Sequence, residues 1–138
     1  MKKTDITSEF EDKNFLFVVS EMLKSKQIYK EDVEKIKELN VISCKIKKFN
    51  GIEYFTALET LFVDNNEFDE IDLSKNTFIT NLSFDETCPK KIILSVQSAK
   101  KININFVNNK ISSRDNNGFL CLEISDKNFD FDEFRKKQ

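Results

Sequence analysis

Six carboxylates in the middle of the chain are the side chains best suited to chemistry. They are Asp64, Asp69, Glu70, Asp72, Asp85 and Glu86. Paired carboxylates can act as general acid and base, and clusters of them can bind calcium. The sequence places no nucleophile or glycine-rich loop beside them, and it contains no histidine, the commonest general base and metal ligand. We therefore interpret the six acids as a solvated surface, and we expect no enzymatic activity, no cofactor and no metal site.

The three cysteines, Cys44, Cys88 and Cys121, are widely spaced and form no CxxC pair. An odd number at such spacing fits neither a disulfide framework nor a zinc site. The pattern predicts three reduced thiols that are mostly buried.

The overall charge and hydropathy exclude two classes of partner. Twenty-two Lys and Arg nearly balance 24 Asp and Glu, for a net charge of -2, so no basic surface for nucleic acid is expected. The apolar run Phe15–Val19 is too short to span a membrane. No apolar signal segment follows the first lysines. We expect a monomer that is cytoplasmic as written, or at the cell surface or secreted if a leader was removed.

A repeat organises the centre of the chain. Its first column is Leu39, Leu61, Leu82 and Ile104, at spacings of 22, 21 and 22 residues. Two residues later stand Val41, Val63, Phe84 and Phe106, and five residues later stand Cys44, Asn66, Thr87 and Asn109. A further apolar column holds Ile46, Phe68 and Ile111, with Pro89 as the exception in the third turn. Repeats of this length are typical of solenoids, in which successive coils stack.

The spacing within each repeat predicts its local structure. Alternating apolar residues give a short strand with one buried face. The Asn, Cys or Thr that follows lies where the chain bends inward, and a side-chain amide there can satisfy backbone groups that the turn leaves unpaired. One such coil cannot bury its apolar face alone, so we expect parallel strands stacked into one sheet.

The two ends of the chain differ from the repeats. Apolar residues at helical spacing predict a helix over Asp12–Lys26, with Asp12 as N-cap, and a second over Lys30–Lys37. At the other end, the polar turn Ser112–Gly118 precedes a predicted strand over Phe119–Ile124, which we expect to pair with the strand at Ile102–Phe106. The tail that follows carries three Phe among acids, and it is either a C-terminal cap, which we favour, or a docking segment.

The segment Ile71–Leu82, IDLSKNTFITNL, carries a family resemblance. It resembles the repeats of bacterial leucine-rich-repeat proteins of the internalin-like and Bacteroides-surface-antigen-like kinds, which typically read LxxLxCSxNxLxxLDLSKNTxLTxL. The likeness covers about residues 10–111, including a cap such as precedes these repeats. Caps of that kind often carry a DxDGxI-like calcium loop, but the equivalent loop here, Lys24–Ile28, has no carboxylate and no glycine. The resemblance implies a binding scaffold and no particular partner.

Together the repeat and the resemblance predict an α/β fold. We expect a short leucine-rich-repeat solenoid of about four parallel strand coils with a helical N-terminal cap and a C-terminal capping strand. It forms a single domain over 1–138, with the helical cap at 1–37, the repeats at 38–111 and the C-terminal cap and tail at 112–138.

The outward strand positions predict one continuous polar and acidic surface, with Phe62 as an exposed aromatic near its centre. The residues expected to contact a partner are Asn40, Thr60, Phe62, Asp64, Asn81, Ser83, Asp85, Asn103 and Asn105. The predicted function is non-enzymatic binding of another protein on this face. Two alternatives stay open: a small cytosolic immunity or inhibitor protein that neutralises a toxin, and a structural remnant of a larger repeat array.

Overall fold

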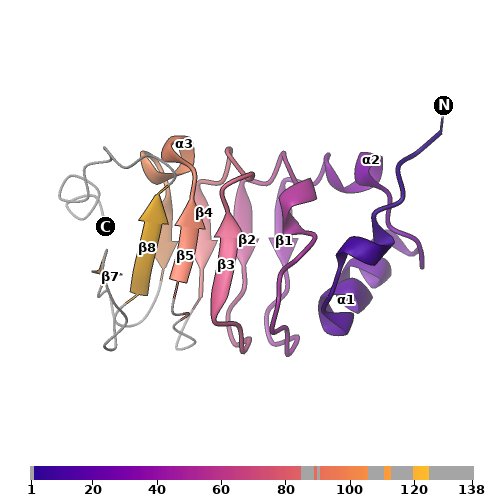
Figure 1. The fold of residues 1–138 in the computed structure, drawn as a ribbon, viewed down its shortest axis with the longest axis horizontal. Coiled ribbons are helices and arrows are strands. Elements are labelled where there is room, and N and C mark those ends of the chain that lie inside the picture. The colour runs from indigo at the N-terminus through magenta and orange to yellow at the C-terminus, as the bar shows by residue number, and fades with distance from the viewer. Residues whose placement is uncertain (1, 85–88, 90, 106–110, 113–119, 125–138) are drawn as a thin grey trace.

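The computed structural model of the chain describes residues 2–84, 89, 91–105, 111–112 and 120–124. Figure 1 shows an elongated stack with the N-terminal helices at one end and the strands arranged in two layers. In chain order the elements are η1 (Thr7–Glu9), α1 (Lys13–Leu23), α2 (Lys30–Val33), β1 (Glu38–Asn40), η2 (Ile52–Tyr54), β2 (Thr60–Phe62), β3 (Glu70–Leu73), β4 (Asn81–Ser83), β5 (Lys91–Leu94), α3 (Val96–Ala99), β6 (Asn103–Asn105), β7 (Ile111–Ser112) and β8 (Leu120–Ile124).

The first sheet has the strand order β1-β2-β4-β6, and all of its pairs are parallel. Its register places Leu39 beside Leu61, Leu61 beside Leu82, and Leu82 beside Ile104. The predicted alignment of the leucine column is therefore confirmed. Leu39, Leu61 and Leu82 are buried, as the alternation of apolar and polar residues requires.

A second sheet, which the repeat analysis did not predict, has the order β3-β5-β8-β7 and is also parallel. After β2 and again after β4 the chain crosses over and returns in the opposite direction as β3 and β5, so the two sheets form two layers (Figure 1). Ile71 and Leu73 from β3 and Ile92 and Leu94 from β5 are buried in the same core as the leucine column.

The first coil contributes no strand to the second sheet. Lys48–Gly51 precede β2 as Glu70–Leu73 precede β4, one repeat of 22 residues later, but Gly51 stands where β3 has Leu73. Gly51 has a φ of 109°, and a Cβ there would come within 2.6 Å of the Phe10 ring. A residue in this left-handed region cannot continue a strand, and glycine adopts it without strain. The second sheet begins one coil later than the first, at β3.

The predicted pairing of the C-terminal strand was wrong. The strand β8 pairs with β5 and β7 in the second sheet, and not with β6 in the first. Its register sets Leu122 beside Ile92 and Ile124 beside Leu94. This register aligns apolar residues of β8 with apolar residues of β5. Where one face of a sheet is buried, such an alignment determines the register.

The N-terminal helices are shorter than the sequence predicted. The helix α1 begins after its N-cap Asp12, as expected, but ends at Leu23 because Lys24 adopts a left-handed conformation with φ 54°. The helix α2 is a single turn that ends at Val33. After it the Ile36 N–H donates to the Val33 carbonyl at 3.1 Å, and the Lys37 carbonyl accepts from the N–H groups of Glu59 and Thr60, at 2.8 and 3.0 Å.

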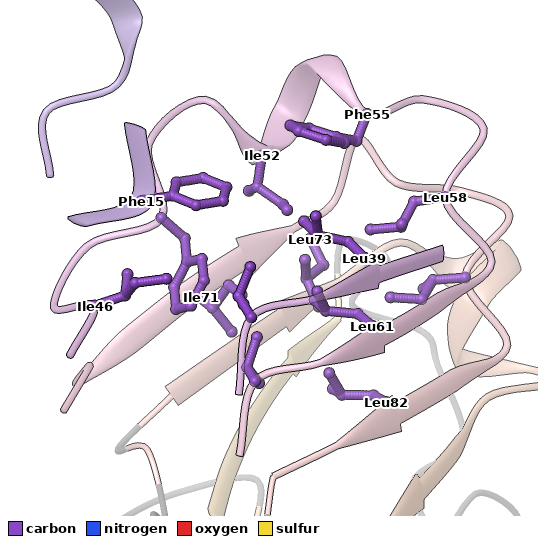
Figure 2. Close-up of a cluster of buried hydrophobic side chains, with 14 of the residues drawn as sticks. Phe15, Leu39, Ile46, Ile52, Phe55, Leu58, Leu61, Ile71, Leu73 and Leu82 are labelled. Carbon is purple, nitrogen blue, oxygen red and sulfur yellow. The ribbon is translucent and has the colours of Figure 1, made fainter. Parts of the chain in front are cut away.

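An aromatic cluster joins these helices to the first coils. The Phe15 ring packs against Phe10, Phe49 and Phe55, with centroid distances of 5.3, 5.2 and 6.3 Å. Figure 2 shows Phe15 beside Ile46 and Ile52, above the stacked leucines of the first sheet. The apolar face of α1 therefore covers the end of the core that the first coil would otherwise expose.

Candidate partner-binding surface

The outward side chains of the first sheet form the surface on which the sequence placed a partner, and we refer to it as the strand face. Strand register brings Glu38, Thr60, Asn81 and Asn103 into one row, and Asn40, Phe62, Ser83 and Asn105 into the next. The alternating burial of β1, β2 and β4 turns the outward members of these rows away from the core. Five of the nine predicted contact residues with described side chains thus lie in these two rows, and a sixth, Asp64, follows β2 two residues after Phe62.

For the remaining three predicted residues the structure describes the backbone of two and leaves the third outside the described residues. The backbone register aligns Asn103 and Asn105 of β6 with the two rows. Asp85 lies outside the described residues, together with Glu86, Thr87, Cys88 and Asn109. The predicted closeness of Asp64 and Asp85 therefore stays a prediction.

A third row continues the ladder beyond the strands. The Val41 N–H donates to the Phe62 carbonyl and the Ser43 N–H donates to the Asp64 carbonyl, both at 2.9 Å. This ladder sets Ile42 beside Asp64 and diagonally across from Phe62. Ile42 is 41% exposed, whereas Phe62 is half-buried. The strand face therefore carries an apolar pair, Ile42 and Phe62, where the sequence predicted a single exposed aromatic.

Asp64 is more constrained than a solvated surface acid. One carboxylate oxygen, Oδ2, accepts from the Ser83 hydroxyl at 3.0 Å. The other, Oδ1, is buried and has no hydrogen-bond partner among the described residues. Asn40 is also held, because its Oδ1 accepts from the Ile42 N–H at 3.1 Å. Hydrogen bonds within the chain therefore orient the Asn40 amide and the Asp64 carboxylate on the strand face.

The turn beneath the strand face is organised by Asn66, as the repeat predicted. Its Oδ1 accepts from the N–H groups of Cys44 and Ile46, at 3.1 and 3.0 Å. Its Nδ2 donates to the carbonyls of Val41 and Val63, at 2.8 and 2.9 Å. A fully buried amide that bonds two successive coils makes the strand face rigid.

A second structural asparagine, Asn76, was not singled out from the sequence. It is completely buried, and its Nδ2 donates to the carbonyls of Ile52 and Phe55, both at 2.9 Å. The backbone carbonyl of Asn76 accepts from the Ser98 hydroxyl of the next coil at 2.9 Å. The signal was present in the LSKNT stretch, but the corresponding residues, counted from the leucine column, are Tyr54 and Gln97, which differ in type and hide the column.

The acidic residues that the structure describes lie on two different surfaces. Asp64 lies on the strand face, whereas Asp69, Glu70 and Asp72 lie at or beside β3 in the second sheet. Among the described residues, no cluster of three or more His, Cys, Asp or Glu side chains is arranged to hold a metal ion. Cys44 is a free thiol that is partly buried, and this burial raises its pKa.

Two parallel sheets built from repeats of about 22 residues, with an asparagine at the inward bend, define a leucine-rich-repeat solenoid. Two solved structures from Listeria monocytogenes share it. An internalin, InlF, aligns with a TM-score of 0.57 and 21% identity over 78% of this chain and 34% of its own. The functional domain of InlJ, which includes a cysteine ladder, aligns with a TM-score of 0.56 and 19% identity over 78% of this chain and 28% of its own.

The structural likeness confirms the internalin-like leucine-rich-repeat fold that the sequence resemblance implied. This chain spans about a third of the length of the internalin structures it matches. No protein-family model matches the chain, and neither does any curated protein sequence. In the described part of the chain, no helix has the length and apolar character needed to cross a bilayer.

Proposed function

We propose that this chain is a non-enzymatic protein-binding module whose partner docks on the strand face. The observation that carries the proposal is the Ile42–Phe62 pair, set among polar side chains on a rigid parallel sheet. An apolar centre with a polar rim is the usual composition of a binding hot spot. Leucine-rich repeats commonly serve as scaffolds of this kind.

The rigidity of the strand face supports this proposal. Its backbone is fixed by parallel ladders, by the Asn66 amide and by buried leucines on the inner side. Binding costs free energy whenever loops and side chains must be ordered, so a surface that is already ordered retains more of its contact energy as affinity.

The charges of the strand face indicate the chemistry of the partner. The charged residues among its described side chains, Glu38 and Asp64, are both acidic. Glu59 flanks them, 3.9 Å from the Lys37 ammonium group. A partner with basic side chains around an apolar contact would complement this arrangement, with the charges accelerating association and the apolar contact providing affinity.

An immunity or inhibitor protein is a narrower form of the same proposal, in which the partner is a toxin. The remnant of a larger array is a different proposal, because such a remnant would have no partner for this face. The two are separated by whether a specific protein binds the strand face.

Site-specific photo-crosslinking tests the proposal. p-Benzoylphenylalanine at Asn40, on the strand face, should crosslink to a specific protein in extract of the source organism. The same group at Gln97, an exposed position on α3, should give no such product. Adding Phe62→Ala should abolish the Asn40 product. Equal products from both positions, or an Asn40 product that survives Phe62→Ala, would assign binding elsewhere.

A further inference from the structure

The strand β3 has one edge with no strand beside it among the described residues. It is the end strand of the second sheet and pairs only with β5. Because the Lys91 N–H donates to the Asp69 carbonyl at 3.1 Å, the main-chain groups of residues 69, 71 and 73 face β5. Main-chain groups alternate between the two edges of a strand, so those of Glu70 and Asp72 face the other edge.

The first coil lies next to this edge but does not pair with it. The main-chain hydrogen bond between the two neighbouring segments comes before β3, where the Glu67 N–H donates to the Ile46 carbonyl at 3.1 Å. Over the described residues, no main-chain hydrogen bond joins Lys47–Glu53 to Glu70–Leu73. Two features accompany this lack of pairing: Gly51 is left-handed, and the N–H groups of Lys47 and Lys48 donate to the Asp12 carboxylate. In Figure 1 β3 is the end strand of its layer, followed by an irregular segment before the helices.

A cleft of about 620 Å³ separates the two segments. Residues of the first coil form one wall, and residues in and around β3 form the other. Its lining carries five carboxylates and three lysines: Glu53, Glu67, Asp69, Glu70 and Asp72, with Lys47, Lys48 and Lys75. One of these lysines, Lys48, is 3.9 Å from the Glu11 carboxylate of the N-terminal segment. The cleft is therefore acidic on balance.

The pattern of side chains along the free edge specifies what could pair with it. Glu70 and Asp72 are exposed on the outer face, whereas Ile71 between them is buried on the core side. A strand added beside β3 would place alternate residues next to the two carboxylates, where opposite charges stabilise the pair. Its intervening residues would turn toward the core side, where the cleft lining includes the almost fully buried Ile52 and Ile71.

We propose that this cleft binds an extended basic segment of a protein, with alternating basic and apolar residues, which adds to the second sheet as a strand beside β3. Strand addition of this kind uses main-chain hydrogen bonds for affinity and alternate side chains for specificity. The site is separate from the strand face, and its existence does not depend on the proposed docking there.

A second copy of the chain is a poorer occupant for the same edge. Two β3 strands placed edge to edge would bring carboxylates of Glu70 and Asp72 against each other, and like charges across strands destabilise the pair. The charge of the cleft therefore favours a basic partner over self-association.

Titration of the full chain with the peptide Ac-KIKVK-NH2, followed by amide NMR, tests the proposal. We expect a Kd below ~1 mM, with the largest shifts at the amides of Glu70 and Asp72 and slower hydrogen exchange there. Two N-methylated peptides provide the control, one methylated at its lysines and the other at Ile and Val. Since alternate N–H groups face opposite edges, one of the two should bind at least ~10-fold more weakly than the other.

Substitutions in the chain complete the test. Glu70→Gln with Asp72→Asn should weaken binding about five-fold, because two cross-strand charge pairs are lost. Asn at position 72 can still accept from the Ser74 N–H, so the following turn is retained. The matched control Glu38→Gln, on the strand face, should leave the affinity unchanged.

Three results would overturn the proposal. The first is the absence of any shift at β3 up to ~1 mM peptide. The second is equal affinity for both N-methylated peptides, which would mean that charge attracts the peptide without strand pairing. The third is a dimer of the chain in sedimentation that protects the β3 amides before any peptide is added.

Discussion

The first and second sheets share one core and alternate along one chain, yet they begin a coil apart. The first sheet starts with β1 in the first coil, and its Leu39 already stands in register with the next coil. The second sheet starts with β3, and in the first coil the left-handed Gly51 stands where β3 has Leu73. The end strand of the second sheet therefore lies beside the first coil, whose described residues contribute no strand to that sheet.

The backbone groups of the first coil that would have entered the second sheet find another partner. The Asp12 Oδ2 accepts from the N–H groups of Lys47 and Lys48, at 2.7 and 3.1 Å. Its Oδ1 caps α1 by accepting from Asn14 and Phe15. The Asp12 carboxylate thus binds backbone N–H groups of the first coil that no described neighbouring strand binds, and it joins α1 to that coil. The comparison shows that polar side chains take over where sheet pairing stops.

Truncating the core should affect both sheets alike if they share one core. Leu61→Ala, in the first sheet, should lower the free energy of unfolding by about 2–5 kcal/mol, because Leu61 is completely buried and leaves a cavity. The matched variant Leu73→Ala, equally buried in the second sheet, should lie in the same range. Urea denaturation measures both. A loss below ~0.5 kcal/mol for Leu73→Ala would show that the second sheet is peripheral to the core.

The two buried asparagines, Asn66 and Asn76, should contribute differently to the free energy of unfolding. Asn66→Ala should cost about 2–4 kcal/mol, since it leaves two N–H groups and two carbonyls unpaired inside the fold. Asn76→Ala should cost about 1–2 kcal/mol, because it removes two hydrogen bonds and also an oxygen that has no partner among the described residues. Chemical denaturation of the two variants gives the order, and a larger loss for Asn76→Ala would contradict it.

Asp12 should make the attachment of α1 sensitive to acid. Burial alone would raise its pKa, but hydrogen bonds from the backbone N–H groups of Lys47, Phe15, Lys48 and Asn14 together lower it. A carboxyl with a lowered folded pKa stabilises the fold above its unfolded pKa of about 3.9, and this contribution is lost as pH falls through the folded value.

The variant Asp12→Asn tests this account. It keeps an acceptor for the helix but loses the second oxygen, so it should cost about 1 kcal/mol at neutral pH and flatten the loss of stability below about pH 4. Thermal denaturation across pH measures the effect. The control Asp5→Asn removes a carboxylate that, among the described residues, accepts hydrogen bonds from Thr7 alone and whose pKa Thr7 also lowers, so it should flatten the acid profile less than Asp12→Asn does. Identical acid profiles for Asp12→Asn and the native chain would refute the role of Asp12.

Of the changes considered, added calcium should have the smallest effect on the stability of the chain. The loop Lys24–Ile28 offers no carboxylate, and hard cations require several oxygen ligands. Adding calcium or a chelator should therefore leave the melting temperature unchanged, as calorimetry would show. A rise in melting temperature with calcium would reveal a site through its binding free energy.

The sequence predicted the first sheet well because its signal is redundant. Four residues of the leucine column recur at nearly equal spacing, and each also alternates with polar neighbours. It did not predict the second sheet, since EIDL is a short alternating segment and KIIL a short apolar run, and the register of both depends on contacts distant in the chain. The pairing of β8 failed for the same reason, because a strand of five residues carries no information about which edge it will join.

The strand face was predicted in outline and not in detail. The repeat placed Thr60, Phe62 and Ser83 on one surface because strand alternation fixes which residues point outward. It could not show that Phe62 is half-buried or that Ile42 is the more exposed apolar side chain, since exposure depends on neighbouring coils. The hydrogen bond from Ser83 to Asp64 likewise needed the register of β2 and β4.

The affinity of Phe62→Ala for the protein captured at Asn40 tests the central claim most directly. Phe78→Ala is the matched control, because Phe78 is 58% exposed and lies off the strand face, between β3 and β4. We predict that Phe62→Ala weakens binding by at least ~2 kcal/mol, or about 30-fold, and that Phe78→Ala leaves it unchanged. Equal affinities of Phe62→Ala and the native chain, with both variants folded, would contradict docking on the strand face.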